Sequence, residues 1–262
     1  MAHTSLLASP ARLSTPPASP AKHVKVLYLD LNDVAALTAA LHGVDILIST
    51  VGVPGILDQI AWIPAIKAAG VKLFVPSDFG ILSTATERKT APSLLETKYQ
   101  VEEALTAGNV LHTMFIHGGF VECCLDSPFM GIDVKNNTLN LVGDARTHSI
   151  TLSSTKYVGA GYASILATTP VDQLVGRTIA LAEVVANGDQ IIVALTKKHG
   201  GVTPKVTVQS LHDVDAEIAT SDFALAPLLR KKWGTDAFTV GSDVWEVPDY
   251  ERSTIEELIL AA

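Results

Sequence analysis

The sequence lacks several features that would assign it to a common class of protein. It has two cysteines in 262 residues, Cys123 and Cys124, and adjacent cysteines rarely pair, so it offers neither a disulfide framework nor a zinc pattern. No basic run occurs and the net charge is −8, which argues against nucleic acid as a partner. Apolar runs are far shorter than the ~20 residues that span a bilayer. These absences predict a cytoplasmic globular protein with no metal, membrane or nucleic-acid partner.

A glycine-rich phosphate loop is also missing. No G-x-G-x-x-G or G-x-x-G-x-x-G motif opens a helix after an N-terminal strand, and the VGVPG stretch has the wrong spacing to replace one. The chain before Val24 is too short for the complete strand, loop and helix. TSLLAS, residues 4–9, is the one N-terminal segment with strand character. Two readings therefore stay open: the N-terminal residues replace the missing strand in part, or the sequence is an incomplete gene product.

Apolar strands alternate with amphipathic helices through the first half of the chain. The pattern predicts strands at 24–30, 45–52, 72–77 and 112–119, with helices between them at 33–43, 57–70 and 94–105. Strands that are apolar throughout, separated by such helices, are typical of a parallel sheet covered on both faces. We therefore expect an α/β fold with a Rossmann-like, doubly wound parallel sheet that is incomplete at the N-terminus.

After Phe120 the pattern changes to that of a smaller α+β portion. Short strands are predicted within 136–144 and 147–153 and at 177–182 and 205–209, and helices at 154–167, at 189–199, up to Lys232 and near the C-terminus. We expect a dinucleotide-binding domain of residues 1–120, to which 149–168 return. Residues 121–148 and 169–262 then form a substrate-binding portion.

Small residues follow the predicted strands, where ligands bind such sheets. These positions are Asp30–Leu31, Thr50–Gly52, Pro76–Gly80 and His117–Gly119. A ligand of a doubly wound sheet lies outside the carboxyl ends of the strands, and small side chains let it approach the backbone. Glycines after strands often only make turns. Four such positions at successive strand ends favour a binding cleft.

One lysine lies on the apolar face of a predicted helix. In LLETKYQVEEAL, residues 94–105, Lys98 falls on the stripe formed by Leu94, Val101 and Leu105. Its stem can pack on the stripe while its ammonium reaches water, and spacing alone favours this reading. In a partly dry cleft, by contrast, the charged form is disfavoured and the side chain becomes a general acid or base.

Several stretches resemble the NmrA-like and isoflavone-reductase-like branch of the atypical short-chain dehydrogenases. They are YLDLND, GVDILISTVG, IKAAGVKLFVPSDFG, LLETKYQVEEAL, HGGF, ANGDQIIVALTKKHGGVTPKVTV and PDYERSTIEELI. The resemblance covers nearly everything from about Val24 onward, but the family's first strand and glycine-rich loop have no counterpart. It implies an NADPH-dependent reductase acting on a small aromatic or carbonyl-bearing substrate.

The resemblance also implies roles for single residues. Lys98 falls where the reductases carry their catalytic lysine, which makes it the general acid/base. Arg12 and Lys22 fall where the family holds the 2′-phosphate of NADPH, for which a guanidinium is suited. The other cofactor-binding candidates are Asp30, Leu31, Thr50, Val51, Gly52, Pro76, Ser77 and Phe79. The substrate candidates are His117, Gly118 and Phe120, although a turn histidine bonded to backbone is the plainer interpretation of His117.

The sequence departs from the family at two further places. Tyr157 stands where the family usually has an acidic residue before the Val-Gly pair, and no tyrosine has a lysine four residues later to form a Tyr-x-x-x-Lys pair. Two other functions stay open: a non-catalytic, NmrA-type dinucleotide-sensing regulator, and a truncated family member with impaired cofactor binding. The absent glycine-rich loop leaves weakened or lost NADPH binding open as well.

Overall fold

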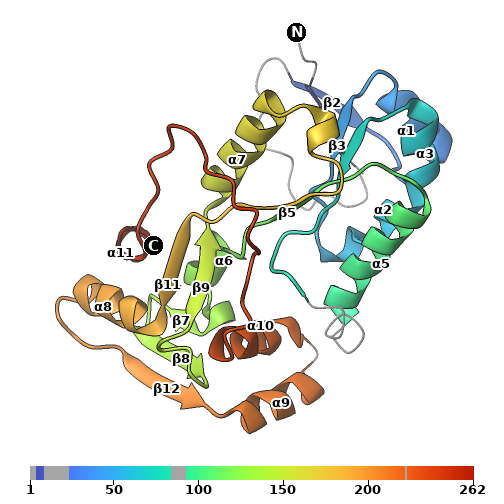
Figure 1. The fold of residues 1–262 in the computed structure, drawn as a ribbon. Coiled ribbons are helices and arrows are strands. Elements are labelled where there is room, and N and C mark those ends of the chain that lie inside the picture. Colours follow the sequence, from blue (N-terminus) through green and yellow to red (C-terminus); the bar gives the residue numbers. More distant parts are fainter. Residues whose placement is uncertain (1–3, 9–23, 84–92, 222) are drawn as a thin grey trace. The chain divides into compact units, whose positions relative to one another are not determined.

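The computed structural model describes residues 4–8, 24–83, 93–221 and 223–262 (Figure 1). Contacts between residues divide the chain into two compact units. The first comprises Met1–Ser77 and Glu96–Thr113, and the second Asp78–Leu95 and Met114–Ala262. Contacts alone assign no ligand to either unit, so the dinucleotide-binding and substrate-binding portions expected from the sequence stay predictions.

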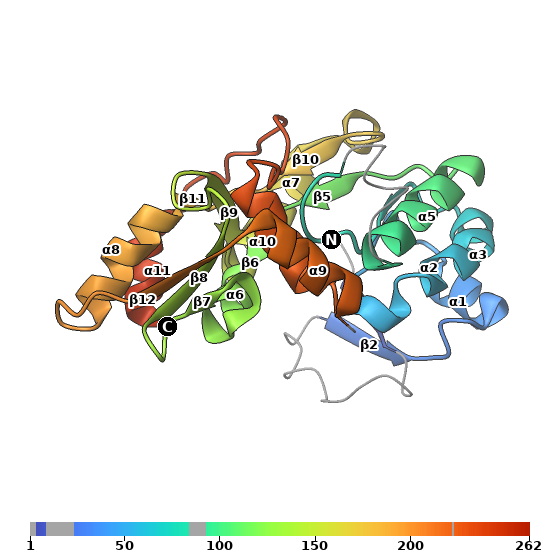
Figure 2. The same ribbon diagram turned by 90° about the horizontal axis from the view of Figure 1, so that it is seen from below.

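The first unit alternates short parallel strands with helices. Its elements are β1 (Thr4–Ala8), β2 (Val24–Tyr28), α1 (Val34–Leu41), β3 (Ile46–Ile48), the 3₁₀ turn η2 (Val53–Gly55), α2 (Asp58–Ala61), α3 (Ile63–Ala69), β4 (Leu73–Val75) and, from Glu96 onward, α5 (Ser93–Ala107). Helices α1 and α3 lie side by side (Figures 1 and 2). This is the alternation of strands and helices that the apolar pattern predicts.

The strands of the first unit form two separate parallel pairs. β1 pairs with β2 from Thr4 opposite Val24 to Ala8 opposite Tyr28, and β3 pairs with β4. No ladder joins the two pairs within the described ranges. β4 is buried, whereas Tyr28 on β2 and Ile48 on β3 are 58% and 39% exposed. The N-terminal TSLLA segment therefore does form a strand, and it pairs with β2.

The helix expected over 57–70 is two helices, and proline is the cause. Pro64 lies in the first turn of α3, where its missing N–H is tolerated, but its ring cannot continue a helix from the preceding turn. The chain therefore restarts at Trp62, between α2 and α3. α3 ends at Gly70, whose φ of 73° is the left-handed conformation that glycine adopts readily.

The second unit contains three small sheets and most of the buried core. Its elements are β5 (Met114–Ile116), β6 (Gly119–Phe120), α6 (Val121–Asp126), η3 (Pro128–Met130), β7 (Ile132–Asp133), β8 (Thr138–Val142), β9 (Ser149–Ser153), α7 (Thr155–Thr168), η4 (Val171–Gln173), β10 (Thr178–Ala180), β11 (Val184–Asn187), α8 (Gly188–Lys198), β12 (Lys205–Gln209), α9 (Leu211–Thr220), α10 (Leu225–Gly234) and α11 (Ile255–Ala261). β5 pairs with β10, β9 lies between β11 and β6, and β8 lies between β12 and β7.

Two features of this unit differ from the sequence expectation. The strand expected over 112–119 is interrupted, because Gly118 turns the chain with a φ of 74° between β5 and β6. Strand β11 was not expected, and it pairs antiparallel with β9. Helices α8 and α11 lie side by side next to this sheet (Figure 2). Among the described residues, no helix has the length and apolarity needed to cross a bilayer.

Candidate functional site

Ser77 connects the segments that follow β3 and β4, and a buried glutamine, Gln59, supports it. The backbone N–H of Ser77 donates to Oε1 of Gln59 at 2.9 Å, and Nε2 of Gln59 donates to the carbonyl of Ile56 at 2.9 Å. The Ser77 hydroxyl donates to the carbonyl of Val51 at 2.8 Å. Gln59 is fully buried, so its two bonds form away from water and hold Ser77, which is bonded to Val51. Two of the expected cofactor residues, Val51 and Ser77, are thereby brought together.

The backbone beside this connection is open. Thr50 and Gly52 are exposed, while Pro76 is buried next to Ser77. A Cβ atom added to Gly52 would meet only Cδ of Pro54, at 3.9 Å. A ligand can therefore approach the main chain closely at this edge of the first unit.

The turn after β2 holds two further expected residues, Asp30 and Leu31. Asp30 is exposed and its Oδ1 accepts a hydrogen bond from the N–H of Asn32 at 2.9 Å, while Leu31 is half-buried. At the start of α1, Oδ1 of Asp33 accepts from the N–H groups of Ala35 and Ala36, both at 3.0 Å. A carboxylate already occupies this helix N-terminus, so it offers no amide cradle for a pyrophosphate. Arg12 and Lys22 lie outside the described residues.

Lys98 lies half-buried on α5. The next residues on its stripe, Val101 and Leu105, are 2% and 0% exposed. Lys98 therefore lies at the edge of an apolar face. Both interpretations of the sequence, a stem packed on the stripe and a general acid or base, require this position. Its catalytic role stays a prediction.

Three aromatic side chains, Phe79, His117 and Phe120, meet in the second unit. We call these three and the neighbouring Tyr162 the aromatic corner. The ring centroids of His117 and Phe120 are 4.2 Å apart, and those of Phe79 and His117 are 5.2 Å apart. His117 is 1% exposed, whereas Phe79 and Phe120 are half-buried. The expected residues Phe79, His117 and Phe120 are therefore brought together as one ring cluster.

Gly118 allows this corner to form. The N–H groups of His117 and Gly118 both donate to the carbonyl of Gly80, at 3.2 and 2.8 Å. A Cβ atom on Gly118 would lie 2.2 Å from the carbonyl oxygen of Thr151 on β9. Since no side chain fits there, Gly118 positions the neighbouring rings by close backbone approach.

Sequence reasoning missed Tyr162 on α7. Its ring packs edge-on against Phe115, with centroids 4.4 Å apart, and lies 6.4 Å from Phe79. The hydroxyl is buried and has no hydrogen-bond partner among the described residues. Burial raises the pKa of Tyr162, and the charge of Asp78 raises it further, so the phenol stays protonated at neutral pH. Tyr162 lies four residues after Val158, on the inner face of α7, and this spacing was the feature of the sequence that indicated its burial.

Gln59 was missed as well. It lies three and four residues before Trp62 and Ile63, on the apolar side of its helix, where a polar residue signals a buried hydrogen bond. The amide provides both an acceptor and a donor, and the structure uses both. It belongs to the candidate site because it supports Ser77.

The fold and the strand-end residues define a Rossmann-like α/β protein. The model of the NmrA-like family matches residues 16–223, so the chain belongs to this family. The resemblance seen in the sequence is therefore confirmed.

Named relatives match part of the chain. The isoflavone reductase homolog P3 of Arabidopsis thaliana is 40% identical over 99 residues, which are 37% of this chain and 32% of the relative. The phenylcoumaran benzylic ether reductase TP7 of Nicotiana tabacum is 38% identical over 92 residues, 34% of this chain and 30% of the relative. The chain thus matches about a third of the length of these curated relatives.

Solved structures match over nearly the whole chain. An isoflavone reductase has a TM-score of 0.75 and 22% identity, over 98% of this chain and 90% of its own. A leucoanthocyanidin reductase from Vitis vinifera, in a binary complex with NADPH, has a TM-score of 0.74 and 19% identity, over 98% and 89%. At this identity the likeness shows the fold, and it confirms the expected Rossmann-like α/β class.

The described residues suit the ribose and the nicotinamide ring of a dinucleotide better than its phosphates. The exposed Thr50 and the open backbone at Gly52 suit the polar groups of a ribose. The helix N-terminus after β2 is closed to a phosphate by Asp33, and the expected phosphate partners lie outside the described residues. In the second unit, the half-buried faces of Phe79 and Phe120 suit a flat ring.

Proposed function

We propose that this chain is an NADPH-dependent reductase of small aromatic or carbonyl-bearing compounds, with Lys98 as general acid/base. One observation carries the proposal: Gln59, Ser77 and Val51 hold the strand ends rigidly beside the open backbone of Gly52. Membership of the NmrA-like family supports it, as do relatives named as reductases.

The residues of the strand ends would bind and orient the cofactor. Thr50, Val51 and Gly52 would contact the ribose and the start of the pyrophosphate, and Arg12 with Lys22 would neutralise the 2′-phosphate. Asp30 and Leu31 would lie toward the adenosine, and Pro76, Ser77 and Phe79 would line the nicotinamide end. When bound, NADPH supplies the hydride.

Lys98 would move the proton that accompanies reduction. Its ammonium would protonate an oxygen that gains negative charge, or its neutral amine would take the proton of a phenol. Such a group contributes ~10²–10⁴-fold in rate. His117, Gly118 and Phe120 would form the substrate side, where the half-buried ring of Phe120 favours flat aromatic compounds and the buried ring of His117 packs against it.

The test separates cofactor binding from catalysis. We expect NADPH fluorescence to change saturably on addition of the protein, and Lys98→Ala to keep this binding while losing ~10²–10⁴-fold in turnover. Lys72→Ala is the matched control, because Lys72 is exposed and its ion pair with Asp45, 64% and 68% exposed, contributes little. Turnover by Lys98→Ala equal to that of the wild type would refute the assignment of this lysine.

A dinucleotide-sensing regulator is the second candidate function. The absent Tyr-x-x-x-Lys pair favours it, since no tyrosine of the chain is followed by a lysine four residues later. This function predicts saturable binding of NADPH and NADP⁺ with no reduction of any substrate offered. Absence of NADPH binding at high micromolar protein would instead support impaired cofactor binding.

A further inference from the structure

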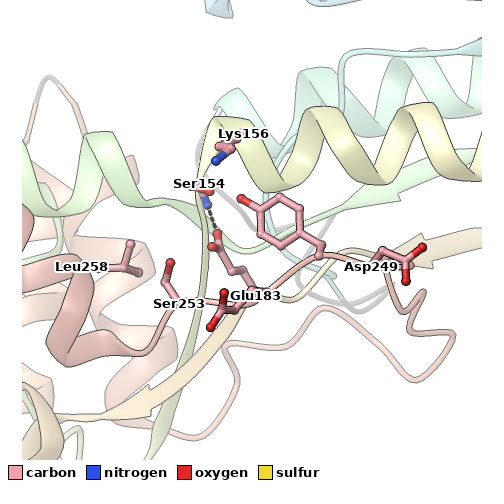
Figure 3. A pocket seen from close by; sticks show the side chains of 8 residues that line it. Ser154, Lys156, Glu183, Asp249, Ser253 and Leu258 are labelled. Atoms are coloured by element: carbon pink, nitrogen blue, oxygen red, sulfur yellow. Dashed lines mark hydrogen bonds between the residues drawn. The ribbon is translucent and has the colours of Figure 1, made fainter.

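A cavity in the second unit shares no residue with the positions proposed for the reductase. Its volume is about 510 Å³, within the range of small-molecule pockets. Its walls come from the start of α7, the residue before β11, the segment 249–253 and α11 (Figure 3). An inference drawn from this cavity is independent of the proposed function.

A buried carboxylate forms one wall of this cavity. Glu183 is 4% exposed, and its Oε2 accepts a hydrogen bond from the N–H of Ser154 at 2.7 Å (Figure 3). Its own N–H donates to Oγ of Ser153 at 3.1 Å, and this hydroxyl donates to the carbonyl of Leu181 at 2.9 Å. The backbone of Glu183 is therefore held by β9, and its carboxylate by the start of α7.

Among the described residues, no cation forms an ion pair with Glu183. Its Oε1 has no hydrogen-bond or ion-pair partner within the described part of the chain, although Glu183 lines the cavity. The positive end of α7 compensates part of the charge. A cation that enters the cavity beside this oxygen would be stabilised by the charge of the carboxylate.

The other walls reinforce this negative field. The residues that line the cavity include three acidic ones, Glu183 and the exposed Asp249 and Glu251, and one basic one, Lys156. Nζ of Lys156 lies 5.9 Å from the ring centroid of Tyr250 and makes no salt bridge with Glu183. The nearby guanidinium of Arg252 is paired with Glu246.

An aromatic wall faces the same space. The ring of Tyr250 lines the cavity and packs edge-on against the buried Tyr157, with centroids 5.1 Å apart and an interplanar angle of 81°. Packing against Tyr157 fixes the orientation of this ring. A fixed ring face beside carboxylates is the arrangement that attracts organic cations.

We propose that this cavity binds a small organic cation that carries an N–H donor, such as a primary ammonium group attached to a flat or apolar body. The ammonium would donate to Oε1 of Glu183, and the body would lie against Tyr250. The described residues contain no group of three or more His, Cys, Asp or Glu able to hold a metal ion, so the geometry favours an organic cation.

Benzylamine is a suitable probe, and benzyl alcohol is its uncharged match. In titrations of the full chain followed by NMR, we expect saturable binding of benzylamine at pH 7, with shifts at Ser154 and Tyr250, and much weaker binding of benzyl alcohol. Glu183→Gln should weaken benzylamine binding roughly tenfold or more, since a hydrogen bond to a charged group contributes about 1.5–3 kcal/mol. Lys156→Gln should strengthen it, because it removes the one positive charge of the lining.

Two further variants keep the test decisive. Glu103→Gln, an exposed position on α5, should leave binding unchanged. Lys156 is exposed, so Lys156→Gln is expected to fold even if Glu183→Gln does not. If Glu183 only caps α7, Glu183→Gln would lower the melting temperature. In that case neither the wild type nor Lys156→Gln would bind benzylamine at about 10 mM. That result, or equal binding of benzyl alcohol, would overturn the proposal.

Discussion

The two units hold their candidate site residues by different means. In the first, Ser77 is held by its N–H bond to the buried side chain of Gln59, and its hydroxyl in turn donates to the carbonyl of Val51. In the second, the rings of the aromatic corner are held by close backbone approach at Gly118, with no side-chain hydrogen bond for Tyr162 among the described residues. The candidate site residues are thus positioned by hydrogen bonds in the first unit and by steric contact in the second.

This difference has an energetic consequence. Removing one partner of a buried hydrogen bond costs about 1–3 kcal/mol, because the other partner stays unsatisfied. Forcing an atom into a contact with backbone costs more, because the backbone cannot move aside as a flexible side chain can. The aromatic corner should therefore tolerate the loss of the Tyr162 hydroxyl but not added volume at Gly118, whereas the strand ends of the first unit should be sensitive to the loss of the Gln59 amide.

The largest effect is expected at Gly118. Gly118→Ala would place Cβ at 2.2 Å from the carbonyl oxygen of Thr151, in a residue with a φ of 74°. We expect a loss of about 4 kcal/mol or more in the free energy of unfolding, measured by urea denaturation. The aromatic corner should be disrupted with it.

Gly176→Ala is the matched control for this substitution. Gly176 has a φ of 75°, but a Cβ added to it would meet no atom within 4 Å. Only the left-handed conformation is then penalised, at about 1–2 kcal/mol. Equal losses for the two variants would show that φ, and not the contact with Thr151, requires glycine at Gly118.

Part of the fold could be predicted from the sequence because local patterns determine it. β12 was predicted with its observed bounds, since KVTVQ lies between a proline and a serine that caps the next helix. The start of α8 follows a capping box of Asn187 and Gln190. β11 was missed because Glu183 interrupts the apolar run at its start, and its pairing with β9 depends on a distant segment.

The candidate site was predictable at its strand ends and not in its supporting residues. Periodicity places Thr50, Gly52 and Ser77 after strands, whatever the rest of the chain does. The contacts of Gln59 and Tyr162 depend on which helix faces which strand, and that is decided by tertiary packing. A polar residue on an apolar helix face indicates burial without indicating its partner.

The intermediate effect is expected in the first unit, at Gln59. Gln59→Leu keeps the volume but removes the acceptor of the Ser77 N–H and the donor to Ile56. We expect a loss of about 1–3 kcal/mol in urea denaturation, together with weaker NADPH binding if the proposed site is correct. Gln100→Leu, at an exposed position on α5, is the control and should change stability by less than about 0.5 kcal/mol. No difference between the two variants would contradict a supporting role for Gln59.

The smallest effect is expected at Tyr162. Tyr162→Phe removes a buried hydroxyl that has no partner in the described part of the chain, and it leaves the edge-on contact with Phe115 intact. Since an unsatisfied buried polar group costs free energy, the variant should be as stable as the wild type or more stable by up to about 1 kcal/mol. Tyr28→Phe is the control, because Tyr28 is 58% exposed and its hydroxyl can reach water. A loss of more than about 1 kcal/mol at Tyr162 alone would mean that its hydroxyl is hydrogen-bonded, and the aromatic corner would then depend on polar contacts as the strand ends of the first unit do.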